Sequence, residues 1–115
     1  MSTQNNLRLT GRIWIEKDGE RLIGKGRVEL LERIKASGSI RQAALQMKMS
    51  YRQAWDMIKD MNQRLDSPVV SSTRGGKGGG NAIVTPKGEK VISNYHLLNG
   101  NFLKFIDDNL PLIDL

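Results

Sequence analysis

The sequence predicts one α+β domain, and three observations lead to that prediction. The chain has 115 residues and a mass of 12.9 kDa, which is the usual size of a single domain. Apolar residues first alternate with polar ones, as in a strand, and then recur every three or four residues, as in helices. Two short segments that begin like capped helices are followed by a pair of β-branched segments around a glycine run. We therefore expect residues 1–115 to form a single domain of mixed helices and strands.

A β-hairpin is expected near the start of the chain. Residues 7–16 alternate apolar and polar side chains, apart from Trp14. Residues 17–19 form a turn signal, because Asp initiates turns and Gly accepts a positive φ, and residues 21–23 supply the returning strand. A helix over 27–36 is expected to follow, with its apolar residues three apart and a glycine just past its end.

Two capped helices come next. Ser39 and Ser50 each precede a glutamine by three residues, which is the capping box S-x-x-E/Q. Each serine hydroxyl is expected to accept from the backbone N–H of its glutamine, while the glutamine side chain returns to the backbone of the serine. A tight turn at residues 48–49 would join the two helices, and the second would run to about residue 65. The side chains expected to pack inward are Leu45, Met47, Ala54, Trp55, Ile58, Met61 and Leu65.

A β-ribbon and a long helix complete the prediction. Strands at 69–74 and 82–84 flank a glycine-rich tip. Thr85 is a suitable N-cap and Pro86 a suitable first residue for a helix over about 86–108. The Asn-Gly-Asn sequence at residues 99–101 is expected to kink or split that helix.

Charge and composition restrict the function classes. A net charge of +6 and a pI near 9.9 favour a polyanionic partner such as double-stranded DNA. The absence of cysteine excludes disulfides and thiolate sites, and a single histidine, His96, gives little support for catalysis or metal binding. The glycine run does not fit a phosphate-binding loop, because Gly80 is followed by Asn81 and Ala82. We expect a non-enzyme without cofactor or metal, and a cytoplasmic location because no membrane span or signal peptide is present.

This order of elements is that of a winged helix-turn-helix, with the helix-turn-helix at about 39–65 and the wing at about 69–84. In that fold the second helix enters the major groove of DNA. Tyr51, Arg52 and Gln53 are expected to read bases, although Gln53 could instead serve only the capping box. Asp56 is expected to orient Arg52 one helical turn away. The expected remaining DNA contacts, mainly to phosphates, are Ser39, Arg41, Gln42, Ser50, Lys59, Arg74 and Lys77, in a chain that has no acid between residues 67 and 88.

Several stretches of these elements are distinctive: Gly38-Ser39-Ile40, Gln42-Ala43-Ala44, Met49-Ser50-Tyr51-Arg52-Gln53-Ala54-Trp55-Asp56, Met61-Asn62, Gly75-Gly76-Lys77-Gly78-Gly79-Gly80, Val84-Thr85 and Gly88. They closely resemble the helix-turn-helix and wing of ModE-type molybdate-responsive transcriptional regulators, and more distantly the LysR-type DNA-binding domain. The resemblance covers about residues 26–98, and the opening hairpin resembles that of short single-domain members.

Full-length members of that family carry a C-terminal oxyanion-binding region that senses molybdate. We expect the present chain, which reaches only Leu115, to lack it. The resemblance therefore implies the fold and sequence-specific DNA binding by a transcriptional regulator, but not molybdate sensing. An effector could be sensed by a separate partner chain or at a dimer interface.

The long last helix is expected to form a homodimer, because a chain of this size has little core to cover it. The residues with heptad-like spacing are Val91, Tyr95, Leu98, Phe102 and Phe105. A dimer would place two recognition helices about 34 Å apart on a pseudo-palindromic site. The alternatives are that the stripe is plain core packing, and that the chain is a protein-interaction or architectural module using the same surface.

Overall fold

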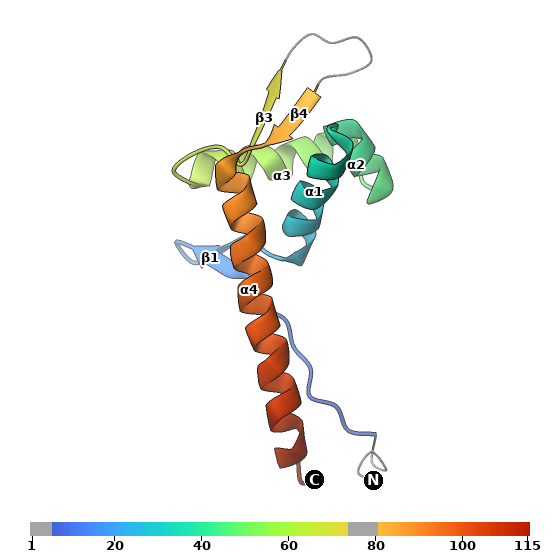
Figure 1. Cartoon of the computed structure of the whole chain (residues 1–115), viewed down its shortest axis with the longest axis vertical. Helices are drawn as coiled ribbons and strands as arrows, with labels where there is room; N and C mark the ends of the chain where they lie inside the picture. The colour runs from blue at the N-terminus through green and yellow to red at the C-terminus, as the bar shows by residue number, and fades with distance from the viewer. Residues whose placement is uncertain (1–5, 74–80) are drawn as a thin grey trace.

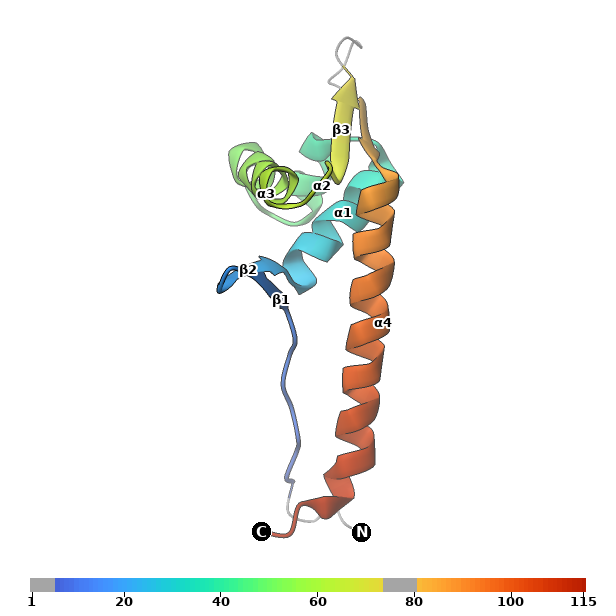
Figure 2. The ribbon, with the colours of Figure 1, turned by 90° about the vertical axis from the view of Figure 1, so that its left-hand side faces the viewer.

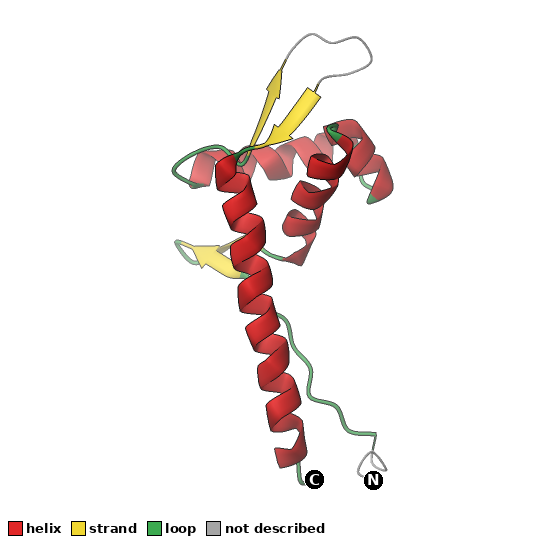
Figure 3. Cartoon of the chain, viewed as in Figure 1, coloured by secondary structure: helices red, strands yellow, loops and turns green. Residues whose placement is uncertain are grey.

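The computed structural model describes residues 6–73 and 81–115. Within them it contains two small antiparallel sheets and four helices, the last of which is long (Figures 1 and 3). The mixed helix and strand content, the N-terminal hairpin and the long final helix confirm the sequence prediction. The elements are β1 Ile15–Lys17, β2 Glu20–Ile23, α1 Lys25–Ser37, α2 Ile40–Gln46, α3 Tyr51–Arg64, β3 Val70–Thr73, β4 Asn81–Val84, α4 Pro86–Asn109 and a 3₁₀ turn at Leu110–Leu112.

The N-terminal hairpin is shorter than predicted. β1 pairs with β2 through a turn in which Asp18 and Gly19 have φ of 54° and 80°. The strand expected over residues 7–16 is wrong for most of its length, because β2 ends at residue 23 and leaves no partner for residues 7–14. Residues 6–14 instead run as an extended segment, in which the carbonyl of Ile13 accepts from the hydroxyl of Tyr95 on α4 at 3.3 Å.

The helix starts follow the capping prediction in part. The hydroxyls of Ser39, Ser50 and Thr85 each accept from the backbone N–H three residues later, at 2.9–3.1 Å. The predicted hydrogen bond from the N–H of Ser39 back to the side chain of Gln42 is wrong. That N–H donates instead to the hydroxyl of Ser37, at 3.2 Å. The side chains of Gln42 and Gln53 are both exposed.

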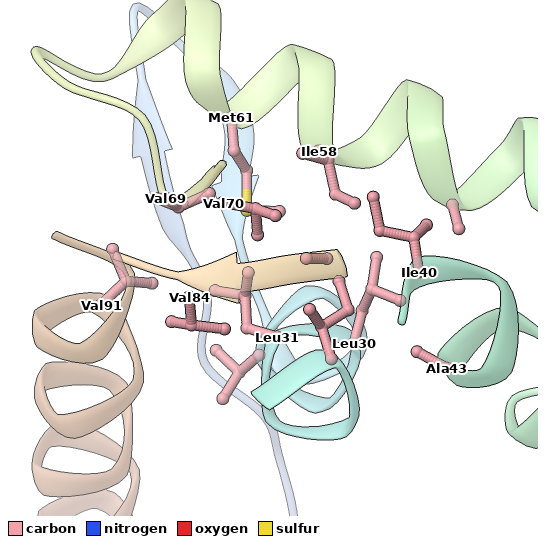
Figure 4. Packing of buried hydrophobic residues seen from close by; sticks show 14 of the residues in the cluster. Leu30, Leu31, Ile40, Ala43, Ile58, Met61, Val69, Val70, Val84 and Val91 are labelled. Atoms are coloured by element: carbon pink, nitrogen blue, oxygen red, sulfur yellow. The ribbon is translucent and has the colours of Figure 1, made fainter. Parts of the chain in front are cut away.

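The core lies where α1, α2 and α3 meet the β3–β4 ribbon and the first turns of α4 (Figure 4). Two predicted core residues are wrong: Leu45 and Trp55 are exposed. Ala54 of α3 faces the core, and the next residue lies about 100° further around the helix, which turns Trp55 outward. The fully buried side chains of the three helices include Leu30, Leu31, Ile34, Ala43, Ala54, Ile58 and Met61.

Helix α4 runs without interruption from Pro86 to Asn109, so the predicted split at residues 99–101 is wrong. A glycine costs a helix about 1 kcal/mol, which a helix of 24 residues tolerates. At its start α4 lies directly on the ribbon, since a Cβ on Gly88 would be 2.3 Å from the carbonyl oxygen of Val69.

The molecule is elongated, with principal extents of 59 × 28 × 21 Å. The β3–β4 ribbon and the far end of α4 point to opposite ends of the long axis (Figures 1 and 2). The far half of α4 extends beyond the three packed helices, with the extended N-terminal segment beside it.

Candidate nucleic-acid interface

The largest group of predicted DNA contacts in the described residues lies on the face of α3 that points away from the core. A tight turn, with φ of 57° at Lys48, joins α2 to α3. Because the core side of α3 is apolar, its polar residues are left on the outside. We call these residues the exposed α3 face: Tyr51, Arg52, Gln53, Asp56 and Lys59.

Arg52 is a highly accessible cation of this face. Its side chain is 88% exposed, and its Nε lies 3.9 Å from the carboxylate of Asp56. Asp56 is therefore beside Arg52 as predicted, but an exposed pair at that distance is worth little, typically below about 1 kcal/mol. The guanidinium thus keeps its donors for a ligand, and Lys59 lies seven residues further along the same side of the helix.

Three side chains contact one another in a chain between α2 and α3, and we call them the Arg41–Tyr51–Trp55 cluster. The guanidinium carbon of Arg41 lies 4.4 Å from the ring centre of Tyr51. The indole Nε1 of Trp55 donates to the hydroxyl of Tyr51 at 2.7 Å. The cluster therefore joins a predicted phosphate contact on α2 to a predicted base contact on α3.

Sequence reasoning missed the role of Trp55 in this cluster. The signal was present in the spacing, because Tyr51 and Trp55 are four residues apart and share a side of the helix. We instead assigned Trp55 to the stripe that contains Ala54.

The root of the β3–β4 ribbon is fixed to α3 by Asn62. Its side-chain oxygen accepts from the N–H of Val69 at 2.7 Å, and its side-chain nitrogen donates to the carbonyl of Val70 at 3.3 Å. On the other strand, β4, the N–H of Ala82 donates to the carbonyl of Gly38, between α1 and α2, at 2.9 Å. The ribbon thus has a defined position relative to α2 and α3. Asn62 stood out in the sequence only as part of the family resemblance.

The predicted wing cations Arg74 and Lys77 lie outside the described residues. Lys87, which lies in the acid-free stretch, is paired with Asp66 at 2.8 Å at the start of α4. The hydrogen bond from that ammonium lowers the pKa of the Asp66 carboxyl. Lys87 is therefore engaged in an ion pair at the start of α4.

Ser39 and Gln42 lie at the start of α2, and Ser50 lies at the start of α3. Ser50 and Gln42 are exposed, and Ser39 is half-buried. Each serine oxygen accepts a backbone N–H and retains its own proton, which it can donate to a phosphate.

The predicted dimer residues divide into two groups. Val91 and Tyr95 are buried in the core of the single chain, so they are not available to a second copy in this structure. Leu98 and Phe105 are 45% and 56% exposed, and Phe102 is half-buried, near Gly11 of the extended segment. Leu97 and Leu103 add further exposed apolar surface to the same half of α4.

Neither a metal site nor a membrane segment stands out in the described ranges. No group of three His, Asp or Glu side chains gathers within residues 6–73 and 81–115. No helix among them has the length and apolar character that a membrane crossing requires. His96 contacts Glu32 of α1 at 2.6 Å, so it links α4 to α1.

Most of the chain is similar in sequence to part of several longer known proteins. No protein-family model matches the chain. The chain is 42% identical over 92 residues to the molybdenum-pterin-binding protein MopB of Rhodobacter capsulatus, which covers 80% of this chain and 34% of MopB. It is 43% identical over 94 residues to the DNA-binding transcriptional dual regulator ModE of Escherichia coli, covering 77% of this chain and 36% of ModE.

A third relative is less similar to the chain and is again matched over about a third of its length. The molybdenum transport protein ModE of Azotobacter vinelandii is 32% identical over 100 residues, which covers 87% of this chain and 37% of that protein. The chain spans about a third of the length of the relatives it matches. These relatives are described as transcription regulators, molybdenum-binding proteins or a molybdenum transport protein, and none of the three descriptions names an enzyme.

Proposed function

We propose that this homologue of the ModE and Mop proteins is a sequence-specific DNA-binding transcriptional regulator. The observation that carries the proposal is the exposed α3 face. It presents Arg52, Gln53 and Lys59 outward, with Arg52 almost fully accessible, in a chain similar to a regulator described as DNA-binding. Such donors suit phosphates and the edges of bases.

The proposed fold is a winged helix-turn-helix. In it α2 supports α3, α3 enters the major groove, and the β3–β4 ribbon is the wing beside it. Support comes from the tight turn at Lys48 and from Asn62, which holds the ribbon against α3. Arg52 and Gln53 would read bases, while phosphates would be held by Ser39, Arg41, Gln42, Ser50, Lys59, Arg74 and Lys77.

We further propose that two copies associate through the far half of α4. Leu98, Phe102 and Phe105 remain for this interface after Val91 and Tyr95 are assigned to the core. Closely spaced apolar side chains on an exposed helix are typical of an interaction surface. A two-fold dimer would then bind a pseudo-palindromic site with its two α3 helices in successive major grooves.

The first test is selection of bound sequences from a random duplex library at physiological salt. We expect enrichment of a two-fold-related motif whose half-sites are about one helical turn apart. Lys59→Ala should weaken binding to the enriched duplex. Lys25→Ala is the matched control, because it removes the same charge from an exposed position at the start of α1, outside both the exposed α3 face and the proposed dimer surface.

Two results would contradict the proposal in different ways. A pool that stays unenriched, with binding that vanishes as salt rises, would indicate an architectural protein held by charge alone. A chain that ignores duplex DNA altogether would be a protein-interaction module, which the exposed apolar half of α4 also suits.

A further inference from the structure

The hydrogen bond inside the Arg41–Tyr51–Trp55 cluster has a direction that its chemistry dictates. An indole N–H can only donate, so the hydroxyl oxygen of Tyr51 is the acceptor in the 2.7 Å contact. The hydroxyl proton of Tyr51 then remains for another acceptor. No side-chain or backbone oxygen in residues 6–73 and 81–115 takes that proton. A hydroxyl that already accepts one hydrogen bond also donates more strongly.

Arg41 is held over the same ring with its donors free. Its guanidinium lies 4.4 Å from the centre of the Tyr51 ring, and no carboxylate in the described ranges is within ion-pair distance of it. Stacking on an aromatic face uses the flat side of a guanidinium and leaves the N–H groups at its edge available. The same contact covers one face of the tyrosine ring.

We propose that Trp55 is a positioning residue that orients Tyr51 and, through its ring, Arg41 as one pair of donors for a phosphodiester of the DNA backbone. The inference rests on the proposed DNA binding and makes it more specific. It moves Tyr51 from the base contacts predicted from the sequence to the backbone contacts. Both groups of the pair have donors to present outward, which suits the acceptor oxygens of a phosphate, the group that takes most hydrogen bonds between proteins and the DNA backbone.

The structure supplies a matched control for Trp55. Trp14, the last residue of the extended N-terminal segment, is 38% exposed, against 36% for Trp55. Its indole also donates to a side chain, that of Glu16 at 2.9 Å. Arg21 lies over the Trp14 ring at 3.8 Å, whereas Arg41 lies over the neighbouring Tyr51 ring and not over Trp55. Trp14→Phe and Trp55→Phe therefore make the same chemical change at similarly exposed positions, but only Trp55 adjoins the exposed α3 face.

The test measures binding of each variant to a fluorescein-labelled duplex of about 30 base pairs, once with a mixed sequence and once with the selected site. Tyr51→Phe and Trp55→Phe should each weaken binding by about tenfold, the value of one hydrogen bond to a charged group. Trp14→Phe should bind like the wild type. Combining Tyr51→Phe with Trp55→Phe should cause no further loss, because the indole then has no hydroxyl to orient.

Two further readouts separate positioning from a merely structural role. The loss in Tyr51→Phe should be equal on both duplexes, because a phosphate contact carries no sequence information. Arg41→Ala should reduce the slope of log K against log salt by about one, the value for one phosphate neutralised. In the Trp14→Phe background Trp55 is the single tryptophan, so its fluorescence should change when duplex is added, and this change should disappear with Tyr51→Phe.

Three results would overturn the inference. In the first, Trp55→Phe binds duplex as tightly as Trp14→Phe does. In the second, the variant with both Tyr51→Phe and Trp55→Phe loses affinity by the product of the two single losses. In the third, Tyr51→Phe loses affinity for the selected duplex only. Equal unfolding temperatures of Trp14→Phe and Trp55→Phe would show that the fold is retained. If Trp55→Phe is unstable, Tyr51→Phe tests the same phosphate contact independently. If the wild type binds no duplex, the proposed function fails and the inference fails with it.

Discussion

At the scale of single residues, the arginines divide into those with partners and those that are free to bind. Arg27 and Arg64 both donate to Asp60, and Arg33 donates to Glu29. Arg41 stacks on Tyr51, and Arg52 has only a long contact to an exposed acid. The count of 18 Lys and Arg residues therefore overstates the number of cations available to a ligand, and the position of each guanidinium decides its role.

Arg52→Ala should relax the preference for one base pair of the selected site. A bidentate arginine–guanine contact is worth about 1–3 kcal/mol of discrimination, and that discrimination should be lost at one position per half-site. The measurement is repeated selection with the variant, followed by comparison of the enriched motifs. An equal loss of affinity for all sequences would show that Arg52 contacts the backbone.

Lys77→Ala should change the salt dependence of binding. If Lys77 neutralises one phosphate, the slope of log K against log salt should fall by about one per chain, with the sequence preference retained. Titrations at several salt concentrations test this directly. An unchanged slope would contradict the wing contact that the sequence predicts.

At the scale of elements, Asp60 connects α3 to α1 and to the hairpin. Its carboxylate accepts from Arg27 at 2.7 Å and from Arg64 at 3.0 Å. Arg64 also donates to the carbonyl groups of Lys17, Glu20 and Arg21, and Arg27 to that of Leu22. One carboxylate thus orients the two guanidinium groups that hold three elements together. The hydrogen bond from Arg27, followed by that from Arg64, lowers the pKa of Asp60 despite partial burial.

Asp60→Asn should lower the free energy of unfolding at pH 7 by about 1–2 kcal/mol, a value reduced from that of a buried pair because Asp60 is partly exposed. A carboxyl whose pKa is lower in the folded state stabilises it fully above its usual pKa of about 4. This contribution is lost as the pH falls through the lowered value. Urea unfolding at pH 7 and in acid should therefore show the two proteins converging in acid.

The matched control is Asp56→Asn, in the same helix, whose pair with Arg52 is exposed and 3.9 Å long. It should change stability by less than about 0.5 kcal/mol. A similar loss in both variants would show that Asp60 does not have the linking role described above.

Two glycines of α4 should respond oppositely to alanine. At Gly88 a Cβ would lie 2.3 Å from the carbonyl oxygen of Val69 and 2.6 Å from Val84, so the helix must move off the ribbon. Gly88→Ala should destabilise the protein by about 1–3 kcal/mol. At Gly100 no atom lies within 4 Å, and Gly100→Ala should stabilise it by up to about 1 kcal/mol. Thermal unfolding compares the two, and a stable Gly88→Ala would contradict the close packing.

Local signals in the sequence predicted most elements, and partners distant in the sequence decided the rest. The capping serines, Gly38 and Thr85 act within a few residues, so their roles were readable from the sequence. The alternation of residues 7–14 is typical of a strand, but a strand needs a partner that the short β2 does not supply. The contact between Arg41 and Tyr51 joins two helices, and no local sequence pattern predicts it.

At the scale of the whole molecule, the proposed interfaces lie far apart. The exposed α3 face and the ribbon lie in one half of the long axis, and the apolar far half of α4 lies in the other (Figure 1). His96 with Glu32, and Lys35 with Glu89, tie α4 to α1 between them. We therefore expect substitutions in the exposed α3 face to leave the proposed association unchanged.

Association is tested with Leu98→Asp combined with Phe105→Asp. We expect the wild type to have twice 12.9 kDa in sedimentation equilibrium and the double variant to have the mass of one chain, because two charges would be buried in the interface. Leu115→Asp is the control, since that side chain is exposed beyond the end of α4. A wild type with the mass of a single chain would contradict the proposed dimer.

The projecting half of α4 also determines how a single copy moves through water. The radius of gyration is 17.7 Å, against about 13 Å for a compact chain of 115 residues. A compact protein with this radius would have about 240 residues, roughly twice the present length. On a gel-filtration column calibrated with compact standards, one copy of this chain would therefore elute where a dimer is expected.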